Sequence, residues 1–224
     1  MTKSIALGES GDMLLDAAAR LFRAKGFAST TVREIARAAG MLPGSLHYRY
    51  SSKEALLLKL MERAIARLTD SIRDAVSVTR DPAERLRLAL RAHLNLLLSG
   101  DDAVYVLLFD WRAITSDAAR DAMASLRDRY ESFWDGLIYE AAGAGQLRHR
   151  LDLRLMRLFG FGAVNWVAQW YDQSDRSRTP EQIADAFWAL LAFGAIADDR
   201  RPADVDGALA LLSAVEPGLA PARG

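Results

Sequence analysis

Apolar residues recur along this chain at the spacing of α-helices. Leu14, Ala17, Ala18, Leu21 and Phe22 follow one another at helical intervals, so they form one stripe on the surface of a helix. No stretch shows the regular alternation of apolar and polar residues that a half-buried strand needs. The pattern therefore predicts an all-α protein.

Short polar motifs indicate where these helices begin. Thr31 to Glu34 and Ser51 to Glu54 have the sequence of capping boxes, in which a hydroxyl and a carboxylate satisfy free amides of the first turn. Asp81-Pro82 and Thr179-Pro180 each place a capping side chain before a proline, whose missing N–H costs nothing at the first helical position. Gly26 suits the left-handed end of the first helix.

Together with the apolar stripes, these motifs predict a series of helices joined by short connections. The expected helices end at Lys25, cover the capping-box segment from Thr31, run from about 52 to the high 70s, end near Gly100, begin near Ser116, and span 152–171 and 180–197, with a short helix around 208–215. The long helix from about 52 is expected to connect an amino-terminal head with a larger body.

Composition indicates an ordinary soluble protein. Of the 224 residues, 51% are apolar and 26% are charged, and the chain has no cysteine and no apolar run long enough to span a membrane. We find no signal peptide and expect a cytoplasmic protein. The net charge of zero hides an asymmetry, because residues 1–60 hold nine basic and five acidic side chains, including every lysine of the chain. A basic head on an acidic body is typical of a protein that binds phosphates.

The segment 31–50 has the residues that a helix-turn-helix requires. Val32, Ile35, Ala36 and Ala39 form a buried face, and Gly40 supplies the turn. A second helix opens at Pro43 and extends to Tyr50, so that its amino-terminal residues would face base edges in a major groove. The spacing alone is weak evidence, since it recurs in many helical proteins.

The stretch from 15 to 60 resembles the head of the tetracycline-repressor family. The matching motifs are Ala18-Ala19-Arg20-Leu21-Phe22, Gly26-Phe27, Thr31 to Gly40, Gly44-Ser45-Leu46-His47 and Ser52-Lys53-Glu54-Ala55-Leu56. The resemblance implies a three-helix helix-turn-helix domain at 1–55 and a helical ligand-binding and dimerising domain at 56–224. It further implies a repressor that binds a palindromic operator as a homodimer and is released by a small effector.

The same resemblance implies which residues contact DNA. Arg33 reaches a base or phosphate, while Ser45, His47 and Tyr48 contact DNA, and Thr31 and Lys53 hold phosphates at helix amino termini. The tip Leu42-Pro43-Gly44 departs from the family, whose members often carry Ser-Lys at the first two of these positions. Because an apolar tip cannot donate to guanine, we expect it to contact thymine methyl groups.

The last two long helices are the expected dimer interface, because family members dimerise there as a four-helix bundle. The residues assigned to it are Leu155, Phe159, Gly162, Ile183, Phe187, Leu190, Leu191 and Gly194. The same apolar stripes would also suit the core of a monomer.

Aromatic residues gather in the body, and they suit either a core or a ligand pocket. The residues assigned to a pocket are Phe109, Arg112, Tyr130, Phe133, Trp134, Leu137, Asn165, Trp166, Gln169 and Trp170. The pattern Asn165-Trp166 and Trp170-Tyr171, with Leu-Pro-Gly-Ser-Leu in the head, resembles a subgroup that senses acyl coenzyme A (CoA) thioesters. That subgroup often has a basic residue where Gln169 stands, and Arg112, Arg154 and Arg157 are candidate substitutes for phosphate recognition.

Two alternatives stay open. A lipophilic cation is a rival effector, with Asp110, Glu131, Asp135 and Glu140 as counter-charges, and a helical scaffold that binds only protein is a rival function. We expect neither an enzyme nor a cofactor or metal site, since the three histidines are scattered and no nucleotide-binding loop is present.

Overall fold

The computed structural model describes residues 2–42, 44, 48–148, 151–174 and 177–194, and within these ranges it contains helices and no strand. The α-helices of this part are α1 (Thr2–Lys25), α2 (Val32–Ala38), α4 (Lys53–Val76), α5 (Pro82–Leu97), α6 (Asp102–Phe109), α7 (Asp117–Gly143), α8 (Leu153–Trp170) and α9 (Pro180–Gly194), with a 3₁₀ turn η1 (Trp111–Ala113) after α6. The predicted all-α fold is confirmed. The short helix expected around 208–215 lies outside the described residues.

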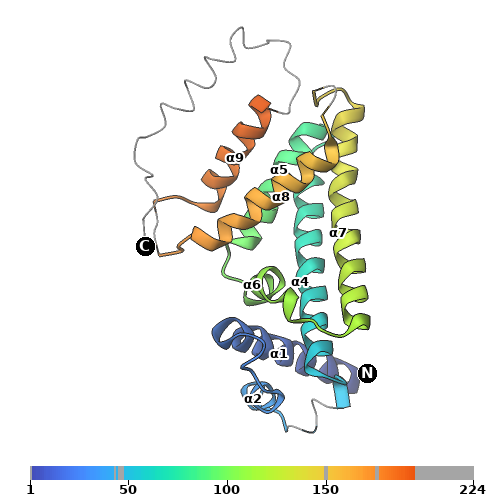
Figure 1. Cartoon of the computed structure of the whole chain (residues 1–224), viewed down its shortest axis with the longest axis vertical. Coiled ribbons are helices and arrows are strands. Elements are labelled where there is room, and N and C mark those ends of the chain that lie inside the picture. The colour runs from blue at the N-terminus through green and yellow to red at the C-terminus, as the bar shows by residue number, and fades with distance from the viewer. Residues whose placement is uncertain (1, 43, 45–47, 149–150, 175–176, 195–224) are drawn as a thin grey trace.

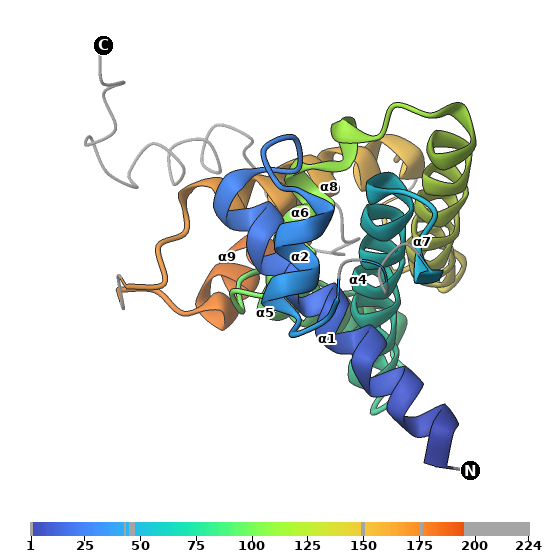
Figure 2. The ribbon, with the colours of Figure 1, turned by 90° about the horizontal axis from the view of Figure 1, so that it is seen from below.

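The helices are arranged as a small head and a larger body. Figure 1 shows α1 and α2 at one end of the molecule, with α4 rising from them into the body beside α7. In the body α5 packs against α4 and α9, and α8 crosses the front of the bundle. Seen from below, α1 runs beneath the body, and its amino-terminal end projects past the other helices (Figure 2). No described helix has the length and apolar character that crossing a membrane requires.

One apolar core runs through the head into the body. Leu14, Phe22 and Ile35 of the head belong to the same buried cluster as Leu57 and Met61 of α4. Each of these side chains is at most 1% exposed, and full burial of such a side chain contributes roughly 1.5–3 kcal/mol. Helix α4 begins at Lys53 and continues this core into the body. The packing therefore shows no boundary after residue 55, and the predicted division into two domains at that point stays a prediction.

The first capping box is confirmed. Thr31 Oγ1 accepts a hydrogen bond from the Glu34 backbone N at 3.2 Å, and Glu34 Oε2 accepts one from the Thr31 backbone N at 2.8 Å. The hydrogen bond from Lys25, together with those from Thr31, lowers the pKa of Glu34 to about 2. The start of α2 is therefore well defined.

The second predicted capping box does not form, because Glu54 does not take part in it. Ser52 caps α4 by accepting from the Ala55 backbone N at 3.0 Å, so Glu54 stands one position too early to complete the box. Its carboxylate instead accepts hydrogen bonds from Thr115, at 2.7 Å from the backbone N and 2.6 Å from the hydroxyl. Hydrogen bonds from Ser116 and Thr115 lower the pKa of Glu54 to about 2. Glu54 thus fastens the start of α4 to the start of α7, whose own N-cap Ser116 makes no side-chain cap.

Helix α6 was not predicted. It has only eight residues and is apolar on all sides after its first turn, so it shows no helical period. The turn before it is held from two directions. Arg23 of α1 donates to the Gly100 carbonyl oxygen at 2.7 Å and to Asp102 at 2.9 Å, and Gln173, which follows α8, donates to the Leu98 carbonyl oxygen at 2.8 Å.

Candidate functional site

The head presents an exposed surface around α2. Thr31 and Arg33 are exposed at the start of α2, and Leu42, Gly44 and Tyr48 are exposed after it. Tyr48 is 92% exposed and Leu42 is 78% exposed, which is unusual for large apolar side chains. The other residues of the expected DNA-reading surface, Pro43, Ser45 and His47, lie outside the described residues.

The turn between the two expected helices has the predicted geometry. Ile35, Ala36 and Ala39 are buried, as expected for the inner face of α2. Gly40 has a φ of +67°, which an L side chain rarely adopts, and the Met41 backbone N donates to the Ala36 carbonyl oxygen at 2.8 Å. The chain therefore turns sharply after α2, as a helix-turn-helix requires.

Lys53 has a different role from the expected phosphate contact. Its Nζ donates to the carbonyl oxygens of Phe27 at 2.7 Å, Thr30 at 2.9 Å and Ala28 at 3.4 Å. The ammonium group also lies over the Phe27 ring, 4.3 Å from its centre. An ammonium group has three donors, and all three serve the loop between α1 and α2. Lys53 therefore stabilises the head from within.

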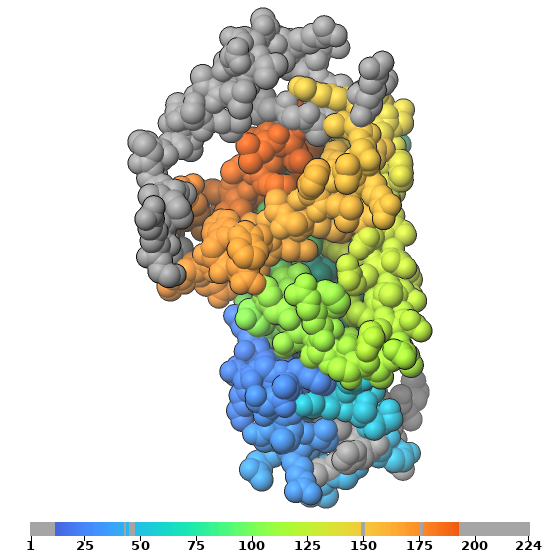
Figure 3. Space-filling view, viewed as in Figure 1, coloured from blue at the N-terminus to red at the C-terminus, as the bar shows by residue number. Residues whose placement is uncertain are grey.

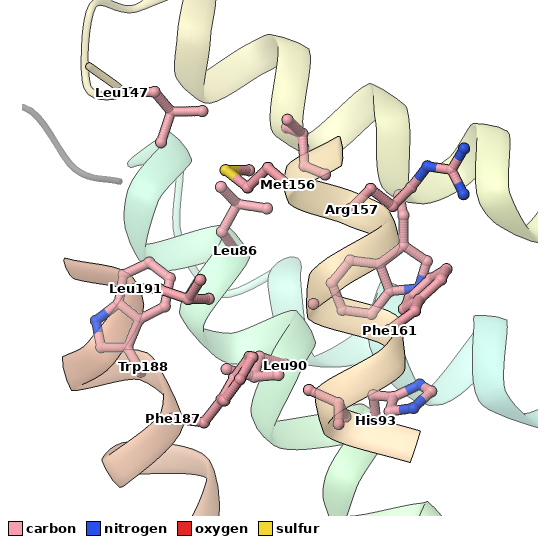
Figure 4. A pocket seen from close by; sticks show the side chains of 14 residues that line it. Leu86, Leu90, His93, Leu147, Met156, Arg157, Phe161, Phe187, Trp188 and Leu191 are labelled. Carbon is pink, nitrogen blue, oxygen red and sulfur yellow. The ribbon is translucent and has the colours of Figure 1, made fainter. Parts of the chain in front are cut away.

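The body contains a cavity between α5, α7, α8 and α9. Counted together with the open solvent at its mouth, its empty space is about 640 Å³. The lining residues are Leu86, Leu90, His93, Trp134, Ile138, Leu147, Met156, Arg157, Gly160, Phe161, Val164, Phe187, Trp188 and Leu191 (Figure 4). The wall is almost entirely hydrocarbon and aromatic, which is typical of a site for an apolar ligand.

The structure brings few of the expected pocket residues together. Trp134 lines the cavity, while Tyr130 and Asn165 contact it through His93. Three others point outward on α8, where Trp166 is 64% exposed, Trp170 is 54% exposed and Gln169 is exposed. The pattern misled because α8 is apolar on two faces, and helical spacing does not tell which face turns inward.

The remaining expected pocket residues lie elsewhere in the body. Phe109 packs against Tyr105, and Arg112 is exposed with its guanidinium 5.0 Å from the centre of the Trp111 ring. Phe133 lies under Arg73 of α4, and Leu137 is buried in a second apolar cluster. These four side chains therefore belong to the packing of the body and to its surface.

A buried hydrogen-bond network forms part of the cavity wall. His93 is 3% exposed, and its Nδ1 lies 2.7 Å from the Tyr130 hydroxyl while its Nε2 lies 3.0 Å from Asn165 Oδ1. Since the amide oxygen only accepts, Nε2 carries the hydrogen, and Nδ1 accepts from the Tyr130 hydroxyl. Burial lowers the pKa of His93 to about 4, although the hydrogen bond to Asn165 works in the opposite direction. The imidazole is therefore neutral at pH 7.

Arg157 stands at the cavity but is bound to acidic partners on α7. Its Nη1 lies 2.5 Å from Glu131 and its Nε lies 2.7 Å from Asp135, and the side chain is 8% exposed. Burial opposes its charge, but the hydrogen bonds that it donates to the two carboxylates outweigh burial and raise the pKa of Arg157. Figure 4 shows the guanidinium directed away from Leu86, Leu90 and Leu191, while its Cζ lies 6.0 Å from the centre of the Phe161 ring. A ligand phosphate would have to compete with both carboxylates.

The outer face of α8 carries an exposed apolar stripe. Leu155, Phe159, Gly162 and Trp166 are all exposed, and Phe159 is 71% exposed. Their spacing places them along one side of α8, which lies on the open face of the body (Figure 3). Exposed apolar stripes of this kind are typical of interaction surfaces.

On α9 most of the expected interface residues turn inward. Ile183 is 9% exposed, and Phe187 and Leu191 line the cavity, whereas Leu190 is 58% exposed. Ile183 is therefore covered by its own chain, whereas Phe187 and Leu191 are only partly buried, and their assignment to the dimer interface stays a prediction. Gly194 ends α9.

Sequence reasoning missed most of the cavity wall. The residues not expected there are Leu86, Leu90, His93, Ile138, Leu147, Met156, Gly160, Phe161, Val164 and Trp188. Phe187 and Leu191 were assigned to the dimer interface instead, and Arg157 was considered only for phosphate recognition. One signal was available for the buried network. His93 interrupts the apolar stripe of α5, and a polar residue in such a stripe needs a buried partner.

Comparison with known proteins indicates the same two functional parts. Residues 14–60 match the family model described as bacterial regulatory proteins of the tetR family. Residues 79–195, which are more than half of the chain, match the model described as the tetracyclin repressor-like C-terminal domain.

Individual proteins are similar over most of their length. The HTH-type transcriptional repressor KstR2 of Rhodococcus jostii (strain RHA1) is 27% identical over 190 residues, which cover 84% of this chain and 92% of KstR2. The crystal structure of AibR in complex with isovaleryl coenzyme A and operator DNA is 26% identical, with a TM-score of 0.72, and covers 81% of this chain and 97% of AibR. The crystal structure of superantigen PfiT is 32% identical, with a TM-score of 0.72, and the match covers 85% of this chain and 97% of PfiT.

Two of the basic residues of the head, Arg33 and Lys53, should respond differently to substitution. Arg33→Ala removes an exposed positive charge and is expected to weaken binding of a DNA site selected from genomic fragments by about 10-fold. Lys53→Met is expected to lower the melting temperature, because three carbonyl oxygens lose their donor, without changing the slope of log affinity against log salt. Fluorescence anisotropy at several salt concentrations and thermal unfolding measure both effects. If Lys53→Met instead lowers the salt slope by about one and leaves the melting temperature unchanged, Lys53 holds a phosphate.

The neutral His93 predicts how stability depends on pH. The unfolded chain takes up a proton on this side chain near pH 6.5, whereas the folded chain does so near pH 4, so the free energy of unfolding falls as the pH falls through this window. The gap between the two pKa values is worth roughly 3 kcal/mol. Urea unfolding at pH 7 and pH 4.5 should show a smaller loss for His93→Gln than for the wild type. If the free energy of unfolding falls equally in both proteins, a group other than His93 causes the pH dependence.

Proposed function

Because the chain belongs to the TetR family of bacterial regulatory proteins and is a ligand-responsive transcriptional regulator, we propose that it represses genes by binding a palindromic operator and leaves the operator when an acyl-CoA thioester enters the cavity. This family consists of regulators rather than enzymes, and a regulator of bacterial DNA works in the cytoplasm. The single observation that supports the effector class is the apolar cavity in the body of a chain that also has a helix-turn-helix head.

Two features support an acyl chain as the part of the ligand inside the cavity. Leu86, Leu90, Met156 and Leu191 offer hydrocarbon surface, and burying a ligand methylene against such surface contributes roughly 0.8 kcal/mol. AibR, which is similar over most of its length, was crystallised with an acyl-CoA thioester and operator DNA. An acyl chain in this cavity would touch four helices at once, so it is suited to change how they pack.

Most of the carboxylates expected to bind a cationic effector are already paired with arginines. Glu131 and Asp135 are paired with Arg157, and Glu140 is paired with Arg85 at 3.1 Å. Asp110 remains, and partial burial raises the pKa of its carboxyl, which makes it a weaker counter-ion. The charges of the body therefore favour the thioester.

We propose that the exposed stripe on α8 is the core of the dimer interface. A palindromic operator presents two identical half-sites, so a repressor that reads it needs two heads related by a twofold axis. Leu155, Phe159, Gly162 and Trp166 of one protomer would face the same residues of a second copy, with Leu190 of α9 at the edge. The small Gly162 allows the helices to approach closely.

Titration of acyl-CoAs tests the effector. Saturated acyl-CoAs of increasing length are added to the complex of the protein with its operator, and anisotropy reports release. We expect the effective one to weaken operator binding about 5–150-fold, and operator to weaken its binding by the same factor, because linkage is reciprocal. Gly160→Leu should abolish release while operator binding persists, since Gly160 lines the cavity and a Cβ there meets nothing within 4 Å. Gly136→Leu, an equally open glycine of α7 away from the cavity, is the matched control. If no acyl-CoA of any length changes operator binding, the thioester is not the effector.

Sedimentation tests the interface. Phe159→Arg places a charge in the centre of the stripe, and burial of an unpaired charge costs several kcal/mol in order of magnitude, so we expect a monomer with weak operator binding. Tyr139→Arg is the control, because Tyr139 is 59% exposed on α7, outside the stripe. A Phe159→Arg variant that sediments as a dimer would locate the interface elsewhere.

A further inference from the structure

The cavity wall contains four side chains with polar groups among its described residues, and these decide what a ligand meets. They are His93, Trp134, Arg157 and Trp188. A ligand atom inside the cavity gains a hydrogen bond from a side chain only if one of these groups has a donor or acceptor to spare. Each of the four is therefore considered for the bonds it already makes and the direction in which it points.

Both ring nitrogens of His93 are occupied. Nε2 donates to Asn165 Oδ1 at 3.0 Å, and Nδ1 accepts from the Tyr130 hydroxyl at 2.7 Å. The ring is packed between other aromatic rings, with Phe161 stacked on it at 6.1 Å and Trp134 edge-on at 5.9 Å between ring centres. Both nitrogen atoms of His93 therefore already have partners within the protein, and the ring has no hydrogen bond left to offer a ligand.

Arg157 and Trp188 turn their polar groups away. The guanidinium of Arg157 is held by Glu131 and Asp135 of α7, and Figure 4 shows it directed away from Leu86, Leu90 and Leu191. In the same view the indole nitrogen of Trp188 lies on the far side of its ring from the other labelled side chains. Only the aliphatic part of Arg157 and the ring carbons of Trp188 face the cavity.

Trp134 is the remaining donor. Its Nε1 is buried and makes no well-aligned hydrogen bond among the described residues, although it lies close enough to the Tyr130 hydroxyl to act on the pKa of Tyr130, which burial raises. The atom is covered by its neighbours, and Phe161 packs edge-to-face against the indole at 5.5 Å. A ligand would reach this nitrogen only after displacing that packing.

We infer that the cavity selects an unsubstituted hydrocarbon acyl group and discriminates against one that carries a ketone or hydroxyl. This inference rests on the proposed acyl-CoA function and names the class of acyl group within it. A polar ligand atom would lose its hydrogen bonds to water and find none in the cavity. Such a mismatch lowers affinity by about 10- to 100-fold.

Three CoA thioesters of one chain length test this selection. They are octanoyl-CoA and its analogues with a ketone or a hydroxyl on the penultimate carbon, and tryptophan fluorescence or calorimetry measures their binding. The inference requires octanoyl-CoA to bind at least about 10-fold more tightly than either analogue. Equal binding of the three thioesters by the wild-type protein would overturn it.

Two variants open the buried network in different ways. Asn165→Ala leaves the His93 Nε2–H without a partner, so both the ketone and the hydroxyl find a donor and should regain most of the lost affinity. Tyr130→Phe leaves Nδ1 as a free acceptor, so the hydroxyl should regain affinity but the ketone should not. If neither variant narrows the discrimination, the network is not what excludes polar groups.

Trp134→Phe tests the competing explanation, in which the indole N–H of Trp134 binds a polar atom of the ligand. If the wild type binds the ketone well and Trp134→Phe loses that binding, the indole N–H recognises the ligand and the inference is wrong. If no CoA thioester binds, the proposed function fails separately, and the cavity is tested with ethylbenzene and acetophenone, which differ mainly by a ketone oxygen. Weaker binding of acetophenone by about 10-fold, relieved by Asn165→Ala, supports the inference, and equal binding overturns it.

Discussion

The hydrogen bonds of His93 fasten three helices at one buried point. His93 lies on α5, Tyr130 on α7 and Asn165 on α8, and none of these polar groups can be left unpaired in an apolar interior without a cost of about 1–3 kcal/mol. The ion pairs of Arg157 with α7 add a second attachment about two helical turns earlier on α8. Together they fix which side of α8 turns inward, and the position of the cavity follows from that.

The orientation of α8 also determines the surface of the body. With Arg157 turned inward, Phe159 and Trp166 point outward, because side chains two and nine residues further along a helix lie on its opposite side. The cavity and the exposed stripe are therefore two faces of one helix. A change in the packing on the inner face is carried by the same rigid element that bears the outer face.

The head is joined to the body through both apolar and polar contacts. The buried side chains of α4 continue the head core upward, while Glu54 reaches the start of α7 and Arg23 holds the turn before α6. Gln173, just after α8, holds that same turn from the other side. The turn at Gly100 thus lies between the head and the helix that bears part of the cavity, so the two parts of the molecule are mechanically connected.

The sequence alone determined the all-α fold, the boundaries of most helices and the helix-turn-helix, because capping motifs, helical period and glycine turns are local properties of the chain. Thr31, Gly40 and Asp81 have the roles that their neighbours in the sequence predict. Only the tertiary structure decided that Lys53 serves the head loop and that Trp166 faces outward while Phe187 faces the cavity. The physical reason is that α8 and α9 are apolar on more than one side, so the side that becomes buried depends on partners distant in sequence, such as those that His93 and Arg157 find on other helices.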